Sequence, residues 1–323
     1  SLGYKNIVLN EFNDLEKIEN YIKKFEENNE KIGANCTYAL ETALLKAAAK
    51  ESGRELWQFV KDDFKAKMPI PIANCIGGGL HSHSKRKPNF QEFLVIPNEN
   101  SFLKNVTKNI HVYFALKKLL KKTENKWKIK ITDENAWQTS LNEIDVLDIL
   151  KKLDIKIGVD VAASTFYDSK KQTYLYKNIL IKRKQEQTMF IQRLINDYNL
   201  FYLEDPFDEE DFNSFAKLKS NNLIVGDDLT TTNLKRIEKA VEKKAINAVI
   251  IKPNQNGYLF DVSKIIKFCK EKKLKIVFSH RSGETMDTAL ADFSVGFDAD
   301  YIKTCIHGKE RLVKLQRLIE IEK

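Results

Sequence analysis

Several features that would narrow the function are missing from this 323-residue sequence. It has only four cysteines, and none of them forms a C-x-x-C pair. Such sparse, widely spaced cysteines are typical of proteins from a reducing compartment without disulfide frameworks or zinc ribbons. The sequence contains no apolar run of about 18 residues that would span a membrane, and its N-terminal segment lacks the apolar core of a signal peptide. We therefore expect a cytoplasmic protein without a membrane partner.

Arginine is also scarce, since only eight of the 54 basic residues are arginine. The formal net charge is nevertheless +9, because 45 acidic side chains oppose those 54. Specific nucleic-acid recognition favours arginine forks and exposed aromatic side chains, and neither clusters in this sequence. We interpret the lysine-rich runs as solvated helix faces, and we do not expect nucleic acid as a partner.

The order of apolar segments predicts an α/β fold. The segments that resemble strands are 71–76, 91–96, 127–132, 156–162, 201–204, 223–226, 248–252 and 275–279. Helix-length amphipathic segments separate most of them. Eight strands in about 250 residues fit one closed barrel better than an open sheet. The first two strands are joined by a glycine-rich loop without a helix, which departs from a regular barrel.

A proline-bounded segment divides the sequence into two parts. We expect two helices before it, a polar one over 14–27 and an alanine-rich one over 35–51. Met68-Pro69-Ile70-Pro71 then marks a boundary, because prolines at this spacing punctuate secondary structure. The prediction is a small, mostly helical capping domain over 1–68 and a catalytic barrel over 69–323.

Polar residues stand at the ends of six apolar runs in the C-terminal half. They follow at intervals of 44, 23, 25, 28 and 23 residues, and they are Asp160, Glu204, Asp227, Lys252, His280 and Lys303. Most of these intervals are close to the length of one strand-plus-helix unit. Because the C-terminal ends of parallel barrel strands open on one face, these side chains should meet at one mouth.

Three carboxylates at that mouth indicate a metal-assisted active site. Carboxylate oxygens suit Mg²⁺ better than zinc. A single acid at a strand end would more often cap a helix or pair with a lysine, but three in successive units favour a metal site. Lys252 follows four apolar residues, so we expect burial and nearby cations to lower its pKa and to make it a base.

Earlier segments add an acid pair and a ligand-binding turn. Glu92 opens the second strand and Glu134 follows the third, and a close pair of carboxyl groups would keep one of them protonated as a general acid. His280-Arg281-Ser282-Gly283 offers a guanidinium fork, a hydroxyl and a backbone amide for a phosphate or carboxylate. Gly77-Gly78-Gly79-Leu80-His81 is suited to folding over a ligand.

With these residues in place, the sequence resembles the enolases, the phosphopyruvate hydratases of glycolysis. The matching segments, in order, are VDVAAS, EDPFDEED, VGDDLT, IKPNQNG, SHRSGET and IKT. The similarity runs from about Ile32 to the C-terminal end, and SHRSGET and GDDLT are specific to enolase proper. The resemblance implies an enolase-type TIM-like barrel with an antiparallel second strand, below a reduced N-terminal α/β capping domain.

The resemblance also implies a reaction and a role for each matching residue. The reaction is Mg²⁺-dependent dehydration of 2-phosphoglycerate, a small phosphorylated carboxylate, by a homodimeric lyase. The implied metal ligands are Asp160, Glu204 and Asp227. Lys252 would remove the proton from carbon 2, and Glu134, supported by Glu92, would protonate the 3-hydroxyl. The implied substrate-binding residues are Lys303 for the carboxylate, Arg281 and Ser282 for the phosphate, Asp228 beside the two lysines, His81 or its rival His83 on the loop, and Gln91 and His280 lining the site.

The sequence departs from the family pattern on its mobile lids. The Gly-Ala-Ser-Thr-Gly loop, whose serine closes over the substrate, is not seen before the first helix, so the N-terminal part is expected to be shortened. Gly-Asp-Glu-Gly-Gly is replaced by Thr132-Asp133-Glu134-Asn135-Ala136, and the histidine loop over 80–88 is longer and more basic. Two interpretations follow: a diverged enolase that still turns over, or an enolase-like module that binds Mg²⁺ or a phosphorylated ligand without turnover. The retained Lys252, Glu134 and Lys303 favour the enzyme, because a scaffold needs no acid–base pair.

Overall fold

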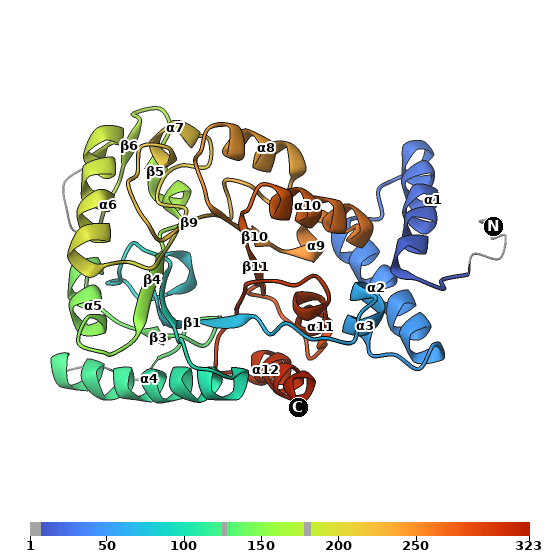
Figure 1. Cartoon of the computed structure of the whole chain (residues 1–323). Coiled ribbons are helices and arrows are strands. Elements are labelled where there is room, and N and C mark those ends of the chain that lie inside the picture. Colours follow the sequence, from blue (N-terminus) through green and yellow to red (C-terminus); the bar gives the residue numbers. More distant parts are fainter. Residues whose placement is uncertain (1–7, 125–127, 129, 178–181) are drawn as a thin grey trace.

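Eight strands close into a barrel at the centre of the molecule (Figure 1). The computed structural model describes residues 8–124, 128, 130–177 and 182–323. Around the ring the strands are β1 (Ile70–Gly77), β2 (Glu92–Ile96), β4 (Lys156–Asp160), β8 (Tyr202–Glu204), β9 (Leu223–Gly226), β10 (Ala248–Ile251), β11 (Lys275–Ser279) and β12 (Tyr301–Lys303). β12 pairs with β1 and closes the ring. The predicted fold class is thereby confirmed.

One strand runs against all the others. β2 is antiparallel to both β1 and β4, whereas every other pair of neighbouring barrel strands is parallel. The first residue of β2 therefore lies at the same end of the barrel as the last residues of the parallel strands. Glu92 pairs in register with Asp160, the last residue of β4. The reversal brings a residue from the start of a strand to the mouth.

The predicted strand over 127–132 was wrong as a barrel strand. Among the described residues of that segment, only Ile131 makes a β-bridge, to Trp137. The short β3 (Trp137–Gln138) pairs with the end of β1, and the eighth place in the ring belongs to β12. The segment KIKIT alternates polar and apolar residues, which is typical of a half-buried strand, whereas these barrel strands are buried on both faces.

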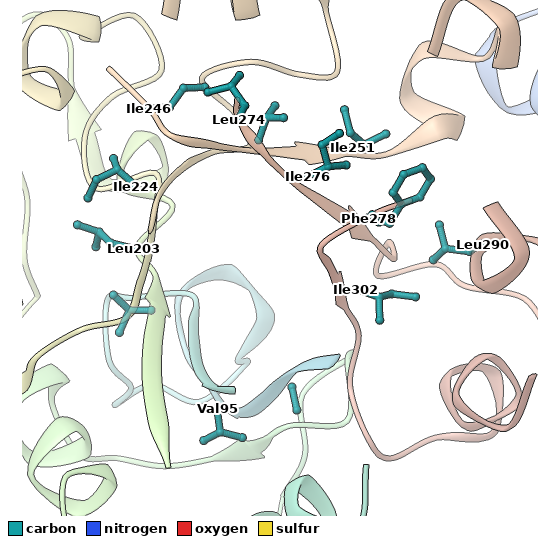
Figure 2. Packing of buried hydrophobic residues seen from close by; sticks show 14 of the residues in the cluster. Val95, Leu203, Ile224, Ile246, Ile251, Leu274, Ile276, Phe278, Leu290 and Ile302 are labelled. Atoms are coloured by element: carbon teal, nitrogen blue, oxygen red, sulfur yellow. The ribbon is translucent and has the colours of Figure 1, made fainter. Parts of the chain in front are cut away.

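Helices surround the barrel and bury the outward faces of its strands. They are α4 (Phe102–Thr123), α5 (Glu143–Leu150), α6 (Lys184–Tyr198), α7 (Phe212–Phe215), α8 (Leu234–Glu242), α9 (Pro253–Asn256), α10 (Leu259–Glu271), α11 (Ala289–Gly296) and α12 (Lys309–Glu322). Figure 2 shows Val95, Leu203 and Ile302 pointing away from the centre of the ring, into this outer layer. A second cluster, which includes Ile72 and Val277, is built from the alternate residues of the same strands and packs inside the ring.

Smaller elements complete the structure. A three-stranded sheet of β5 (Tyr167–Asp168), β6 (Thr173–Tyr174) and β7 (Lys182–Arg183) lies between β4 and α6 in the sequence. Single 3₁₀ turns are η1 (Phe12–Asp14), η2 (Gly79–His81) and η3 (Ala163–Phe166). Over the ranges given above, the structure contains no helix of the length and apolar character that crossing a membrane requires.

Three N-terminal helices pack against one side of the barrel (Figure 1). They are α1 (Leu15–Asn28), α2 (Ala34–Glu51) and α3 (Leu56–Lys61). Their buried side chains belong to the same cluster as the outer barrel core, and the ring of Phe12 meets that of Phe297 edge-on at 5.5 Å. Gly296 of α11 lies so close to α3 that a Cβ there would stand 2.9 Å from Val60. The domain boundary at 68/69 stays a prediction.

Two buried carboxyl groups join these helices to α10. Glu41 of α2 accepts a hydrogen bond from the Leu259 amide at 2.7 Å, and Glu19 of α1 accepts one from the Phe260 amide. Both side chains are almost fully buried. Burial and the neighbouring Glu19 charge raise the pKa of Glu41 to about 9. At neutral pH Glu41 therefore carries a proton, which removes the repulsion that two buried carboxylates would exert on each other.

The raised pKa of Glu41 should make the free energy of unfolding depend on pH. We expect it to fall as the pH rises from about 4.5, the ordinary pKa of this carboxyl group, to about 9, its pKa in the folded protein. Between these limits the folded state holds a proton that the unfolded state has released, so the slope approaches about 1.4 kcal/mol per pH unit. Glu41→Gln cannot ionise and should flatten this dependence, leaving the variant more stable than wild type at high pH. Urea unfolding at a series of pH values measures the effect. Glu16→Gln, at an exposed site on α1, is the control, and equal slopes in both variants would contradict the assignment.

Candidate active site

The six predicted strand-end residues meet at the C-terminal mouth of the barrel. The last residues of β4, β8 and β12 are Asp160, Glu204 and Lys303, and the residues directly after β9, β10 and β11 are Asp227, Lys252 and His280. Five of the six are buried, and the side chain of Lys252 is 17% exposed. Each charge follows an apolar strand, so the sheet itself places it beside the others.

Lys303 stands among three carboxylates. Its Nζ lies 3.1 Å from Asp160 Oδ2, 2.8 Å from Glu204 Oε1 and 3.0 Å from Glu92 Oε2. Burial alone would lower the pKa of Lys303, but these carboxylates raise it well above its usual value. Burial and the charge of Asp160 raise the pKa of Glu204, which also accepts a hydrogen bond from the Tyr202 hydroxyl. The cluster thus places three carboxyl groups around one ammonium group.

Lys252 forms an ion pair with Asp227, and this contact corrects the sequence-based expectation. We expected burial and nearby cations to lower the pKa of Lys252. Burial and Lys303 do act in that direction, but Asp227 outweighs them and the pKa is raised. In the same way, burial would raise the pKa of Asp227, but Lys252 lowers it. Lys252 can act as a base only when Asp227 is engaged elsewhere.

Glu134 lies beside the ring at the end of β1. Its partners are Ser282 Oγ at 3.1 Å, Asn74 Nδ2 at 3.3 Å, His280 Nε2 at 3.5 Å and His81 Nδ1 at 3.6 Å. Burial would raise the pKa of Glu134, but His280 and His81 lower it well below its usual value. Burial raises the pKa of Glu92, and Lys303 offsets this only in part. Oxygens of the two acids lie within 4.8 Å of each other. The opposite pKa shifts favour the proton of this pair on Glu92, whereas the sequence-based expectation placed it on Glu134.

A tight turn presents Glu134 to the site. The Asn135 amide donates to the Thr132 carbonyl at 3.0 Å, and the Ala136 amide donates to Thr132 Oγ1 at 3.1 Å. Asn135 has φ of +65°, a left-handed conformation that favours glycine and that asparagine also tolerates. Asparagine therefore replaces one glycine of the family pattern while the backbone keeps its course.

The loop between β1 and β2 brings one histidine to the acids. His81 Nδ1 lies 3.9 Å from Glu92 Oε1 as well as beside Glu134, whereas His83 is exposed. The Gly78 amide donates to the Gln91 carbonyl at 2.9 Å, and the Gln91 amide donates to the Asp160 carbonyl at 3.0 Å. A Cβ at Gly78 would stand 2.5 Å from the Phe90 carbonyl oxygen, so the loop folds this tightly only with glycine there.

A hollow of about 650 Å³ opens beside the mouth, between α2 and the turn after β11. Arg281 and Ser282 line it. Two other cations of the hollow are already paired, Lys46 with Asp287 at 2.6 Å and Lys314 with Glu284 at 2.7 Å. Within the described ranges Arg281 has no carboxylate partner. Its guanidinium group is therefore free to bind an anion such as a phosphate.

The donor chemistry of the mouth fits a magnesium ion. The candidate ligands Asp160, Glu204 and Asp227 offer only carboxylate oxygens, which hard divalent cations prefer. Asp205, which the sequence did not single out, lies beside one of them: its carboxylate accepts from the Asp227 and Asp228 amides. Oxygens of Asp205, Asp227 and Asp228 lie within 4.8 Å of one another, whereas Asp160 and Glu204 are paired with Lys303. Burial and Asp227 raise the pKa of Asp228 to about 6. A bound cation would balance the charges of these crowded acids when they ionise.

Unpaired polar atoms support a ligand-binding role. Ten buried side-chain atoms lack a hydrogen-bond partner among the described residues, and five of them surround Glu134. These five are Asn74 Oδ1, His81 Nδ1, Glu92 Oε2 and both ring nitrogens of His280. Glu92 Oε2 still forms its ion pair with Lys303, and His81 Nδ1 and His280 Nε2 face Glu134 beyond hydrogen-bonding geometry. Asn74 Oδ1 and His280 Nδ1 are therefore the two without any polar partner in the described part of the chain. Buried polar atoms are nearly always paired in native proteins, so a concentration of unpaired ones marks the place where a ligand or water supplies the partners.

Comparison with known proteins gives one consistent result. Residues 65–323 match the family described as enolase, C-terminal TIM barrel domain. The chain is 37% identical to the enolase of Methanosphaera stadtmanae, covering 97% of this chain and 80% of that protein. It is 39% identical to the enolase of Pyrobaculum aerophilum over 90% of this chain and 73% of that protein, and 35% identical to the enolase of Archaeoglobus fulgidus over 96% and 79%.

Proposed function

The chain belongs to the enolase family, and on that premise we propose that it dehydrates 2-phosphoglycerate to phosphoenolpyruvate with Mg²⁺ as its cofactor. One observation supports this choice over a binding module without turnover. The mouth holds a lysine paired with a carboxylate, Lys252, and a carboxyl pair that carries one proton, Glu92 and Glu134. A purely structural or ligand-binding barrel has no use for a base and an acid on the same cavity.

The base and the acid reach the substrate from different parts of the ring. Lys252 follows β10, and Glu134 lies beside β1, three strand positions away around the barrel. In the proposed reaction Lys252 takes the proton from carbon 2. The proton that Glu92 holds passes to Glu134, which gives it to the 3-hydroxyl, and the hydroxyl leaves as water. Removing a proton and a hydroxyl from neighbouring carbons requires groups on two sides of the substrate, and this placement supplies them.

The remaining residues hold the two anionic ends of the substrate. Arg281 and Ser282 bind the phosphate, and Ser282 also contacts Glu134, so the phosphate site is built against the acid. Lys303 binds the carboxylate, while Gln91, His81 and His280 close the sides of the cavity. Asp228 acts on the two lysines through its charge.

Asp160, Glu204 and Asp227 would hold the magnesium ion, with Asp205 bracing the last of them. When bound, the ion would stabilise the negative charge that develops on the substrate carboxylate, worth several kcal/mol. Lys252 and Lys303 now occupy those carboxylates as counterions. Binding of Mg²⁺ by these acids and release of Lys252 from Asp227 are therefore linked.

The ultraviolet absorbance of the conjugated product tests the proposal directly. We expect phosphoenolpyruvate to form from 2-phosphoglycerate only when Mg²⁺ is present. Protein that is folded and binds Mg²⁺ but shows no turnover would support the alternative, a phosphate-binding or Mg²⁺-binding module.

We further propose a cytoplasmic homodimer, as the family resemblance implies. Light scattering of the purified chain measures its mass against the 37.4 kDa of one copy. A mass of one copy at micromolar concentration would contradict the dimer without affecting the reaction assigned above.

A further inference from the structure

Asn74 is a buried amide of the site that none of the roles above uses. It lies in β1, is fully buried and donates from Nδ2 to Glu134 Oε2 at 3.3 Å. Its backbone oxygen accepts from Cys305 Sγ, also at 3.3 Å. The register of β1 against β2 shifts between Asn74 and Ile76, which marks a β-bulge. Bulges often re-aim a side chain near an active site, and here the irregularity accompanies a polar amide in an apolar strand.

The second polar atom of this amide has no partner. No donor among the described residues reaches Asn74 Oδ1, although the atom is buried. A buried acceptor without a donor destabilises the folded protein, so such atoms are rare. Two ring nitrogens that also lack a hydrogen bond, His81 Nδ1 and His280 Nε2, face the same carboxylate at 3.6 and 3.5 Å. The missing donor therefore belongs to whatever occupies the space beside Glu134.

We propose that Asn74 positions Glu134 and accepts, through Oδ1, a hydrogen bond from the hydroxyl group that leaves the substrate. This inference rests on the proposed dehydration. With its one hydrogen directed at Asn74 Oδ1, the hydroxyl turns a lone pair toward Glu134. Lys252 takes the carbon 2 proton, the electron pair forms the new carbon–carbon double bond, and the carbon 3–oxygen bond breaks. The oxygen takes the proton that Glu92 has passed to Glu134 and departs as water, while Asn74 Nδ2 donates to the Glu134 carboxylate that remains.

Asn74 acts in the second chemical step, the departure of the hydroxyl, and not in the removal of the carbon 2 proton. Exchange of the carbon 2 proton with solvent needs Lys252 but not the departure of the hydroxyl. We expect Asn74→Asp, which keeps the shape but loses the Nδ2 donor, and Asn74→Leu to lower kcat for phosphoenolpyruvate formation roughly 10- to 100-fold. KM should stay within about threefold, and exchange of deuterium into carbon 2 should continue.

A matched control is available in the same protein. Asn109 of α4 is also fully buried, donates from Nδ2 to the Pro71 carbonyl at 3.2 Å and has an unpaired Oδ1. It lies on a helix outside the ring, and its hydrogen bond goes to a backbone carbonyl near the start of β1, away from the mouth. Asn109→Leu should therefore lower the thermal midpoint about as much as Asn74→Leu while leaving kcat close to wild type.

The outcomes distinguish this inference from the proposed function. Wild-type protein without turnover would remove the dehydration and this role together. Wild-type turnover with equal kcat in the Asn74 and Asn109 variants would overturn the role of Asn74 alone. Loss of exchange and dehydration in parallel would show general damage to the site and would also overturn it. Retained exchange with slowed product formation is the result we expect.

Discussion

Lys252→Ala is expected to lower kcat by roughly three orders of magnitude, within the 10²–10⁴ range of general acid–base groups. The ammonium group of Lys252 forms its ion pair with Asp227, and alanine removes the amine assigned as the base. Exchange of the carbon 2 proton should disappear together with product formation, in contrast to the Asn74 variants. Deuterium exchange followed by NMR and the absorbance assay measure the two steps separately.

The control is a lysine of the opposite barrel end. Lys275 begins β11, pairs with Asp300 at 3.0 Å and is exposed, so Lys275→Ala should leave both rates unchanged. Lys252→Ala also leaves the buried Asp227 without a cation, and we expect some loss of stability that added Mg²⁺ restores. Exchange that persists in Lys252→Ala would show that another group is the base.

We expect Mg²⁺ to reverse the order of stability of the Glu204→Gln variant and wild type. Burial and Asp160 raise the pKa of Glu204, so its ionised form costs free energy in the folded protein. Without Mg²⁺ the neutral variant should be at least as stable as wild type. At 100 times the dissociation constant, Mg²⁺ should stabilise wild type by about 2.7 kcal/mol and the variant by much less. Turnover should fall at least about 100-fold.

Thermal unfolding at increasing Mg²⁺ concentration measures this reversal. Glu209→Gln is the control, since Glu209 is exposed on the same strand-to-helix loop and should respond to Mg²⁺ like wild type. Equal stabilisation of the Glu204 variant and wild type would place the ion elsewhere, with the group of Asp205, Asp227 and Asp228 as the next candidate.

The sequence predicted the positions of the strand ends better than the protonation states of the side chains on them. A charge directly after a buried apolar run can be recognised without a structure, and that rule located Asp160, Glu204 and Lys252. The direction of the Lys252 pKa could not be derived in this way, because it depends on how close one carboxylate lies. Which of Glu92 and Glu134 holds the proton likewise depends on two histidines from other segments.

Other features could not be predicted from the sequence because they break the local pattern of apolar and polar residues. Asn74 stands inside the apolar run IPIANCIG, and only its hydrogen bond to Glu134 shows that it faces the acids. Asp205 was part of a recognised motif, but its bracing contacts to two backbone amides depend on its left-handed backbone, at φ of +42°. β12 has only three residues, too few for a periodic signal, although its final Lys303 was identified.

The reversed direction of β2 has a further consequence for how this barrel can change. In an ordinary β/α unit the chain leaves at the mouth and returns to the opposite end, so added residues must still span the height of the barrel. Between Gly77 and Glu92 the chain both departs from and re-enters the same rim, and the two ends pair directly. Extra length there alters neither strand spacing nor register. The loop with His81 should therefore tolerate insertions, so that evolution or engineering can change access to the cavity with little effect on folding.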